Sequence, residues 1–429
     1  VQDCTKNLLT RTVNPEYYRL GDSYYTPDIV LSTWFQAESG RIPVSGAGYG
    51  GPFSGPGFDA MWTDMSEIVR PTRDGIHGRE YINTSVDIGR KLPHLPLVDG
   101  QLTAIPPPLA EAPFPVIFDV IPDHWQRGQV RAAVTASAAE IGTLAVVRDE
   151  AGRVGDPTYD GHHVIPLLAG PTTAGRRFAS PLVMIEDQPD VLSLQASLKK
   201  DRPQQIVVIR VPATPTVAQR VVELTEAGAE VIHLVFDSHG LESPDPLAEG
   251  DAGKGDSPLL PERRSVPGFA QKGTVPFSGV VRRHVRDVLR DVHGTLVRRG
   301  IRDVVTLVAS GGIAQAEHVA KAIICGADLV AIDIPLLLAL ECRLCGECQR
   351  DERCPIALDE MGEDYGVQRI VNLMGAWHQQ LSEVLGAMGI REVRRLRGET
   401  GRSMFFEDLE RDTFGRLFGK RTNPGPQVT

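Results

Sequence analysis

Short apolar runs alternate along this chain with longer segments of helical periodicity. The clearest example begins with QQIVVIRVPA, a predicted buried strand, continues through TPTVAQRVVELTEAGA, a predicted amphipathic helix ended by Gly228, and reaches EVIHLVFDS, the next predicted strand. A chain that alternates strands with helices pairs its strands in parallel, because each helix returns the chain to the same end of the sheet. The alternation therefore predicts an α/β fold with a parallel sheet.

The number of such units favours a (β/α)8 TIM-type barrel. Aromatic residues make up only 6% of the chain, and the apolar runs are rich in Val, Leu and Ile, which is typical of strands buried on both faces. The candidate strands are one more than a barrel needs, so one is expected to be false or extra. They cover residues 42–47, 116–120, 143–147, 164–168, 182–185, 206–211, 231–236, 304–309 and 329–333.

Composition shifts divide the chain into four predicted regions. Residues 1–40 are a polar N-terminal arm, and residues 41–340 are the barrel, with a Pro- and Gly-rich insertion at about 238–280. An insertion of that length without apolar periodicity is typical of a lid or a binding loop. Residues 341–356 form a cysteine-rich loop, and residues 357–429 form a helical extension with apolar spacing of three and four.

Four of the six cysteines crowd into one segment, CRLCGECQRDERCP, which contains Cys342, Cys345, Cys348 and Cys354. Soft thiolate ligands select iron–sulfur clusters or zinc. Two short spacings, then a longer one and Cys-Pro, are similar to the ferredoxin run, although the last spacing is longer here. Structural zinc sites generally use two separated cysteine pairs. An iron–sulfur cluster is favoured, with zinc or free thiols as the alternatives.

A second motif follows the predicted strand at 304–309. Ser310, Gly311 and Gly312 turn the chain into a helix, and Gly326-Ala327 precedes the last predicted strand. Glycine lets the backbone approach a ligand, and barrels commonly hold a phosphate at the loops after strands seven and eight. The motif predicts a phosphate site, with a purely structural βα turn as the alternative.

These motifs together resemble the end of the FMN-binding synthase domain of glutamate synthase. The resemblance covers residues 305–355, including the sixteen-residue step from Gly326 to Cys342. It extends to VVIRVPA…TEAGAEVIHLVFDSHG and to the helical segment after the cysteines. It is good over 180–400 and weaker over 40–110, where RIPVSGAGYGG replaces the first strand and loop that contact the flavin.

The resemblance implies two cofactors. FMN phosphate would contact the Ser-Gly-Gly turn and Gly326-Ala327, and Gly46, Ala47 and Gly48 would lie beneath the flavin ring. Three cysteines of that family hold a [3Fe–4S] cluster; the additional Cys345 implies a [4Fe–4S] cluster, with [3Fe–4S] as the alternative. The resemblance assigns catalytic roles to Arg210, Asp237 and His239; for Asp237 and His239, a cap of the turn after their strand is the alternative.

Three positions depart from the family pattern. Arg210 stands where the family has lysine, and Ser310 replaces an aspartate. Asp333 replaces a phosphate-binding glycine, and a carboxylate there repels a phosphate dianion unless it points away.

A charged loop at 70–80 is a candidate clamp for a dicarboxylate substrate, because Arg binds carboxylates bidentately; an exposed, salt-bridged loop is the alternative.

Composition limits the partners. The formal net charge of −10 and the absence of a basic, aromatic-rich stripe argue against nucleic acid. No apolar run is long enough for a membrane helix, and clustered rather than dispersed cysteines favour a reducing, cytoplasmic compartment. The expected partners are a small-molecule substrate, an electron donor such as ferredoxin or a reductase subunit, an amidotransferase subunit, and further copies of the chain. Because the chain opens with Val1, it is also a candidate fragment.

The leading functional hypothesis is a flavin-dependent oxidoreductase similar to glutamate synthase. Electrons would pass from the cluster to FMN and leave as hydride to an imino or oxo acid. The alternative from another class is a non-catalytic electron-transfer or scaffold subunit that keeps the cluster without a competent flavin site; the changes at Ser310 and Asp333 favour it. An IMP dehydrogenase-like barrel is a third hypothesis, against which the four clustered cysteines argue.

Overall fold

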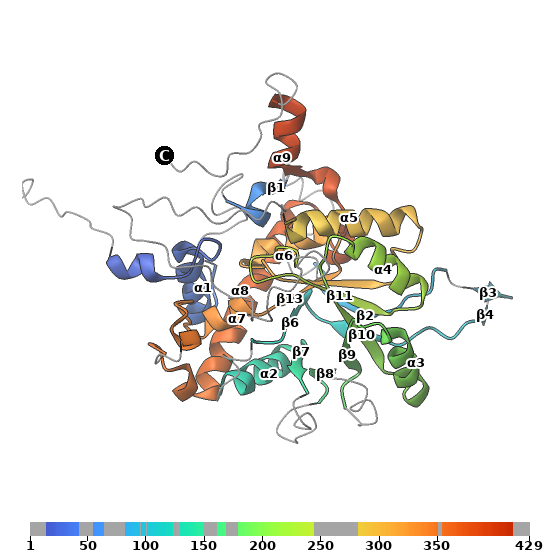
Figure 1. Cartoon of the computed structure of the whole chain (residues 1–429), viewed down its shortest axis with the longest axis horizontal. Helices are drawn as coiled ribbons and strands as arrows, with labels where there is room; N and C mark the ends of the chain where they lie inside the picture. The colour runs from blue at the N-terminus through green and yellow to red at the C-terminus, as the bar shows by residue number, and fades with distance from the viewer. Residues whose placement is uncertain are drawn as a thin grey trace, which may run out of the picture.

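Eight parallel strands close into a barrel at the centre of the computed structural model (Figure 1). The structure describes residues 14–42, 55–63, 82–94, 96–99, 101–122, 125, 129–149, 161–168, 179–243, 282–350 and 354–414. Each strand pairs with its neighbours in chain order, and the last pairs with the first. The strands are β6 (Val116–Phe118), β7 (Ala145–Arg148), β8 (Val164–Leu168), β9 (Leu182–Glu186), β10 (Ile206–Pro212), β11 (Val231–Val235), β12 (Thr306–Ser310) and β13 (Leu329–Ile332).

The barrel predicted from the alternating pattern is confirmed, and its strands correspond to eight of the nine candidate segments. The remaining candidate, 42–47, lies almost entirely outside the described residues. The barrel strands are nearly continuous runs of buried apolar side chains, as expected for strands covered on both faces. Closure also leaves no unpaired strand edge.

Helices cover the outside of the barrel. An example is the helix after β10, in which Val217, Val221 and Leu224 are buried at helical spacing while Glu223 faces solvent. The outer helices in the described part of the chain are α2 (Gln129–Ile141), α3 (Val191–Asp201), α4 (Val217–Glu226), α5 (Val285–Arg298) and α6 (Ala316–Cys325). None of the described helices is long and apolar enough to cross a lipid bilayer.

The two ends of the chain pack together beside the barrel. Helix α1 (Pro27–Ser39) contacts α8 (Glu363–Ala387), the helix expected after the cysteines, and α8 buries Trp377. Strand β1 (Met61–Thr63) pairs antiparallel with β14 (Ser403–Phe405), which precedes α9 (Phe406–Leu409). The predicted N-terminal arm and C-terminal extension therefore share contacts that the sequence did not indicate.

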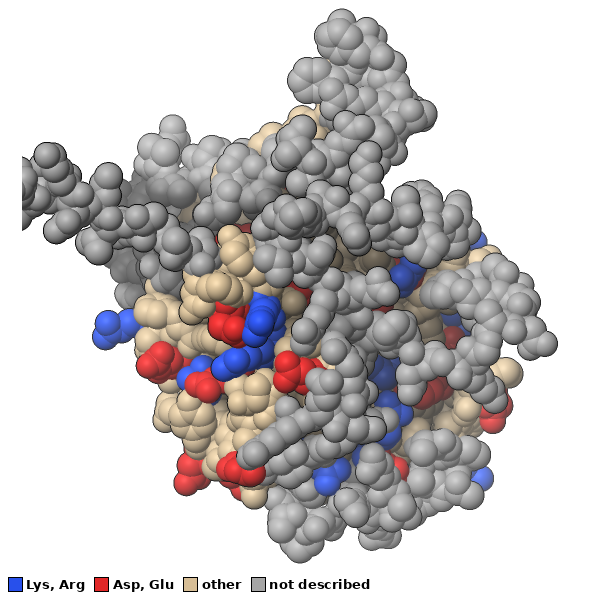
Figure 2. All heavy atoms as spheres, turned by 60° about the vertical axis from the view of Figure 1, so that its left-hand side comes forward, with Lys and Arg blue, Asp and Glu red and all other residues tan. Residues whose placement is uncertain are grey.

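Smaller elements complete the described chain. A short helix, α7 (Ile334–Ala339), follows β13 directly. Strand β2 (Val86–Gly89) pairs with β5 (Leu109–Ala112), and β3 (Leu97–Val98) pairs with β4 (Gln101–Leu102) in a hairpin that projects at the right of Figure 1. The face shown in Figure 2 carries acidic and basic side chains interspersed rather than gathered by sign.

Candidate functional site

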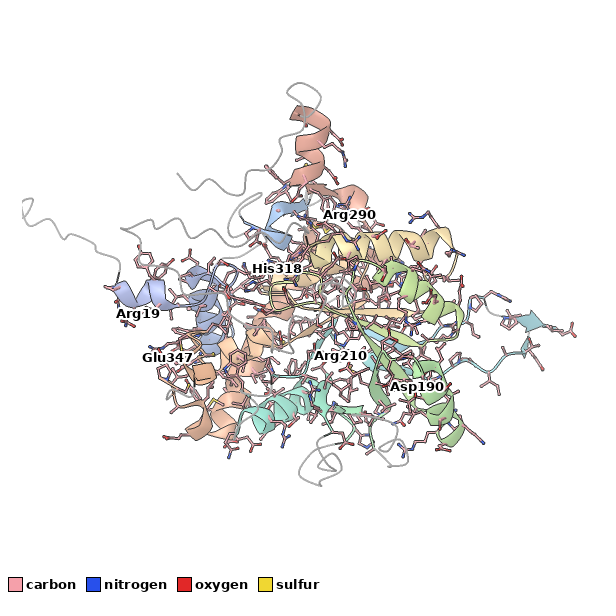
Figure 3. The ribbon with its side chains drawn as sticks, in the orientation of Figure 1. Arg19, Asp190, Arg210, Arg290, His318 and Glu347 are labelled. Carbon is pink, nitrogen blue, oxygen red and sulfur yellow. The ribbon has the colours of Figure 1, made fainter. Side chains whose placement is uncertain are left out.

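Charged side chains meet where the barrel strands end, which is the end at which barrel enzymes hold their active sites. Arg210 of β10 lies inside the barrel (Figure 3). Its guanidinium approaches Asp119, after β6, at 3.5 Å and Glu186, at the end of β9, at 3.3 Å. His233 of β11 places Nε2 2.9 Å from Ser310 Oγ and 3.7 Å from Asp119 Oδ2. Five strands therefore converge on one polar cluster.

Burial and mutual charge set the ionisation of this cluster. Burial alone would raise the pKa of Asp119, but Arg210 and His233 outweigh it and hold that pKa below its usual value. Burial lowers the pKa of His233 to about 4, so the imidazole is neutral near pH 7. Arg210 keeps its charge, because Asp119 and Glu186 outweigh the effect of its burial on its pKa. The cluster is a fixed ion pair beside a neutral histidine.

The Ser-Gly-Gly turn after β12 is shaped by close packing against the loop after β11. Gly311 and Gly312 have φ of +95° and +69°, a region that side chains disfavour. A Cβ on Gly311 would lie 2.4 Å from the Asp237 carbonyl oxygen. Gly312 N–H donates to the Ser238 carbonyl at 3.2 Å, and Tyr24 O–H donates to the Gly312 carbonyl at 2.6 Å. The glycines therefore have a structural reason independent of any ligand.

The N-terminal arm reaches this end of the barrel. Asp22 Oδ2 lies 2.9 Å from His239 Nε2, and the Tyr24 ring stacks on His239 with centroids 5.4 Å apart. Burial raises the pKa of Asp22, but the hydrogen bond and charge of His239, together with the backbone N–H groups of Tyr24 and Tyr25, outweigh it and lower that pKa overall. Tyr25 O–H donates to the Ser238 carbonyl at 3.0 Å. The arm thus orients His239 from a part of the sequence more than two hundred residues away.

The Asp237 carboxylate binds backbone groups of its own turn and does not contact the His239 imidazole through a described hydrogen bond. Its Oδ1 accepts from the backbone N–H groups of His239 and Leu241, at 3.0 and 2.8 Å. Its Oδ2 accepts from Arg282 Nη2 at 2.7 Å. Both carboxylate oxygens are therefore engaged, which matches the alternative that this residue caps a turn.

Asp333 begins α7 and points back onto it. Its Oδ1 accepts from the Ile334 N–H at 2.6 Å. Burial and the nearby Asp119 charge raise the pKa of Asp333 to about 6, although Ile334 N–H and Arg210 partly oppose them. The carboxylate expected to disturb a phosphate thus lies against the helix end.

This raised pKa predicts a pH-dependent effect of Asp333→Asn. A carboxyl whose pKa is higher in the folded chain favours folding when protonated, and that contribution is lost as pH rises through about 6. Asn keeps an oxygen to cap α7 and has no charge. We expect the variant to gain unfolding free energy at about pH 7.5 and little at about pH 4.5, measured by urea unfolding. An equal change in unfolding free energy at both pH values would contradict the raised pKa of Asp333.

Not every predicted contact residue reaches the barrel mouth. Gly326 and Ala327 lie between α6 and the start of β13, at the opposite end of the barrel, where Gly326 packs on His293. Their predicted phosphate contact is therefore wrong, because the strand carries them away from the mouth. Gly46, Ala47, Gly48 and the charged loop at 70–80 lie outside the described residues.

Several residues of the mouth were missed by sequence reasoning. Asp119 and Glu186 each sit at the end of a buried strand, so strand-end position was the signal that could have found them. His233 was placed on its strand without a role. Asp22 and Tyr24 carry no local signal, because only the folded arm brings them to the barrel.

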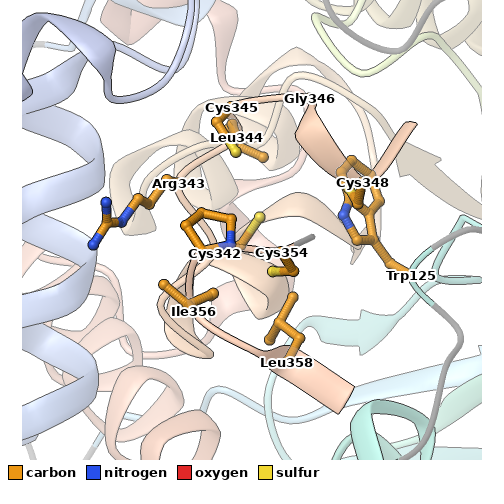
Figure 4. Close-up of a pocket in the computed structure, with 11 residues that line it drawn as sticks. Trp125, Cys342, Arg343, Leu344, Cys345, Gly346, Cys348, Cys354, Ile356 and Leu358 are labelled. Carbon is orange, nitrogen blue, oxygen red and sulfur yellow. The ribbon is translucent and has the colours of Figure 1, made fainter. Parts of the chain in front are cut away.

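The four clustered cysteines line one pocket beside the barrel (Figure 4). The loop is anchored by Cys342 N–H, which donates to the Leu337 carbonyl of α7 at 3.0 Å. Trp125, which follows β6, also lines the pocket, and its indole lies near enough to Cys348 to lower the pKa of that thiol, against the effect of burial. Burial raises the pKa of Cys342 to about 12, so metal binding must displace its proton. One short helix separates this pocket from the end of β13.

The spacing of the sulfur atoms decides what kind of metal group fits. A tetrahedral zinc ion places its sulfurs about 3.8 Å apart, given Zn–S bonds of about 2.3 Å. No three of these cysteine sulfurs lie within 4.8 Å of one another; the only described group that does so is Asp59, Glu317 and His318. Lys321 already pairs with Asp59 and Glu317 in that group, at 3.7 and 3.1 Å. The cysteine pocket suits a multi-iron cluster better than one zinc ion.

Comparisons with known proteins agree with this architecture. A family model described as the conserved region in glutamate synthase matches residues 285–391, which run from α5 to the end of α8 and include all four cysteines. An archaeal glutamate synthase [NADPH] of Archaeoglobus fulgidus is 24% identical over 96% of this chain and 86% of its own length. An archaeal-type glutamate synthase [NADPH] of Dehalococcoides mccartyi is 24% identical over 92% of this chain and 83% of its own length.

A solved structure, a mandelate oxidase mutant with a monooxide FMN adduct, covers 89% of this chain and 93% of its own, with 14% identity and a TM-score of 0.45. The closed barrel and the sequence matches define the class, an α/β-barrel oxidoreductase. The chain is similar to glutamate synthases over most of its length, as a divergent relative. The predicted resemblance to glutamate synthase is thereby confirmed.

Proposed function

We propose that this chain is a flavin- and iron–sulfur-dependent oxidoreductase that passes electrons between a cluster and a flavin at the barrel mouth. The observation that carries the proposal is the pocket of Cys342, Cys345, Cys348 and Cys354, one short helix from the strand ends. Similarity to glutamate synthases supports the flavin and makes an imino or oxo acid the proposed hydride acceptor.

The cysteine pocket fits a cluster by its ligand chemistry. Four cysteines line it, and no three of their sulfurs lie within 4.8 Å of one another, whereas zinc holds its sulfur ligands about 3.8 Å apart. A [4Fe–4S] cluster uses all four cysteines, whereas a [3Fe–4S] cluster leaves one thiol free. When bound, the cluster supplies one-electron transfer. The protein anchors it through α7 and excludes water with Trp125, which is 3% exposed.

The mouth fits the ring of a flavin better than its phosphate. Arg210 Nε and His233 Nδ1 are buried there without a hydrogen-bond partner among the described residues. The Arg210 N–H is a donor, and Nδ1 of the neutral His233 donates or accepts according to its tautomer. These groups suit a planar heterocycle edged with carbonyl and nitrogen atoms, and the Arg210 charge would stabilise an anionic reduced ring. The rim does not fit a phosphate group, because Asp333 already occupies the start of α7.

Cofactor analysis of anaerobically purified protein tests the proposal. We expect iron, sulfide and released flavin, and reoxidation of the reduced protein by 2-oxoglutarate with ammonia or glutamine. Zinc or no metal in the preparation would refute the cluster. If every substrate leaves the reduced flavin unoxidised, the synthase reaction is refuted and a different acceptor is required.

A second candidate is the non-catalytic electron-transfer or scaffold subunit. It is favoured by the ion pairs that engage Arg210 and by the Asp333 carboxylate at the rim, which together satisfy much of the mouth without a ligand. Iron without flavin in the purified protein, and no flavin uptake on addition, would select this candidate.

The proposed partners follow from the electron balance. A two-electron reduction needs a donor, and the relatives above are named for NADPH. We propose a ferredoxin or an NADPH-linked reductase subunit as donor, an amidotransferase subunit as ammonia source, and self-association in the cytoplasm. Pull-down and size measurements on the holoprotein test these contacts.

Trp125→Phe is expected to lower the reduction potential of the cluster. The indole of Trp125 lies beside Cys348, and an N–H that donates to a ligand sulfur would stabilise the reduced, more negative cluster, so loss of the indole makes reduction harder. Redox titration followed by electron paramagnetic resonance would measure the shift to a more negative midpoint. Trp34→Phe, in α1 and outside the cysteine pocket, is the control and should leave the midpoint unchanged. Equal midpoints in both variants would contradict the assignment.

A further inference from the structure

The rim formed after β12 and β13 is where a barrel commonly holds a ligand phosphate. Two groups of donors usually make that site: the backbone of the turn after strand seven, and the N-terminus of a short helix after strand eight. This chain has both elements, as the Ser310-Gly311-Gly312 turn and α7. A phosphate can bind there only if the backbone N–H groups of these two elements are not already hydrogen-bonded within the chain.

Every N–H in the first turn of α7 is already satisfied. Ile334 N–H donates to the Asp333 carboxylate at 2.6 Å. Pro335 has no N–H. Leu336 and Leu337 both donate to the Asp333 carbonyl, at 3.0 and 3.4 Å. Asp333 alone therefore satisfies the helix end at which a phosphate would bind.

Two backbone donors on the other side of the rim are also engaged. Gly312 N–H donates to the Ser238 carbonyl at 3.2 Å, and Ala314 N–H donates to His318 Nδ1 at 3.1 Å. Tyr24 covers the Gly312 carbonyl with its hydroxyl. A phosphate that bound these two N–H groups would have to displace contacts that join the turn to the β11 loop and α6.

Charge adds to the same conclusion. Asp333 lies close enough to Asp119 for the two carboxylates to repel each other, and the nearby Arg210 is already paired with Asp119 and Glu186. A phosphate dianion at this rim would add two negative charges beside these carboxylates. The Asp333 carboxylate supplies, from within the chain, the anion that a ligand supplies in other barrels.

We propose that Asp333 takes the place of a ligand phosphate at this rim, so that the mouth recognises a flavin by its ring and ribityl chain and binds riboflavin at least as tightly as FMN. The inference rests on the proposed flavin function. The preferred ligand is therefore a flavin whose binding does not depend on a phosphate group at the rim between β12 and α7.

Titration of the holoprotein, stripped of flavin but with its cluster intact, tests this preference. Riboflavin and FMN are added separately, and quenching of flavin fluorescence gives each Kd. We expect the riboflavin Kd to equal or fall below that of FMN. Asp333→Gly frees the Ile334 N–H and removes the charge, so FMN binding should tighten about tenfold while riboflavin binding changes less than about twofold.

Matched variants separate the outcomes. Asp190→Gly removes an aspartate from the same N-cap position of α3, where it makes no capping bond, and should alter neither Kd. If Asp333→Gly does not fold, Asp333→Asn removes the charge alone. This variant should still lower the Kd of FMN relative to the Kd of riboflavin. FMN binding about tenfold tighter than riboflavin in the unchanged protein would overturn the inference and leave the flavin function intact. Failure to bind either flavin would overturn both.

Discussion

Serine at Cys342, Cys348 or Cys354 is expected to remove the cluster. Each of these thiolates would bind one iron, and a hydroxyl is a much poorer ligand for iron than sulfur. Iron should fall from about four atoms per chain to near zero. Unfolding free energy should fall as well, because cluster binding contributes to folding. Iron and sulfide analysis, the visible spectrum and thermal unfolding measure the change.

Cys345→Ser separates the two cluster types. If the cluster is [4Fe–4S], this variant should retain about three irons and acquire the paramagnetic signal of an oxidised three-iron cluster. If the cluster is already [3Fe–4S], iron content should not change. Cys325→Ala is the control, since Cys325 is buried in α6 beside Met61 and outside the pocket. Loss of iron in that control would mean that general destabilisation, and not ligand removal, explains the result.

Arg210→Met is expected to destabilise the protein by about 3–5 kcal/mol, because it leaves Asp119 buried without its charge partner. Asp119→Asn removes the other half of the pair. The double variant Arg210→Met/Asp119→Asn should lose less than the sum of the two single losses, since no buried charge is left unpaired. Urea unfolding of the four proteins gives the coupling free energy.

A surface pair provides the matched control for this measurement. Arg220 on α4 holds Asp187 at 3.0 and 2.6 Å, a shorter geometry than that of Arg210, but it is 32% exposed against 14% for Arg210. Arg220→Met should therefore cost only about 0–1 kcal/mol. Similar losses for the two arginine variants would show that burial of the mouth cluster does not control its stability.

The two functional candidates differ in what the mouth of the barrel does with this cluster. A working flavin site needs Arg210 and His233 to face a ring, and both retain an unpartnered nitrogen among the described residues. A scaffold subunit needs only a stable barrel beside the cysteine pocket, which the Arg210–Asp119 pair supplies. Flavin binding, measured before any activity assay, therefore decides which account of these residues is correct.

The alternation of buried strands and amphipathic helices determined the barrel, because periodicity and burial are local properties of the chain. The cysteine run likewise identified its own pocket, since all four sulfurs come from one short loop. Only the tertiary structure placed Asp22 and Tyr24 on His239, set Asp333 against α7 and carried Gly326 to the far end of the barrel. Contacts between distant segments depend on closure of the barrel and on side-chain direction, and a linear pattern records neither.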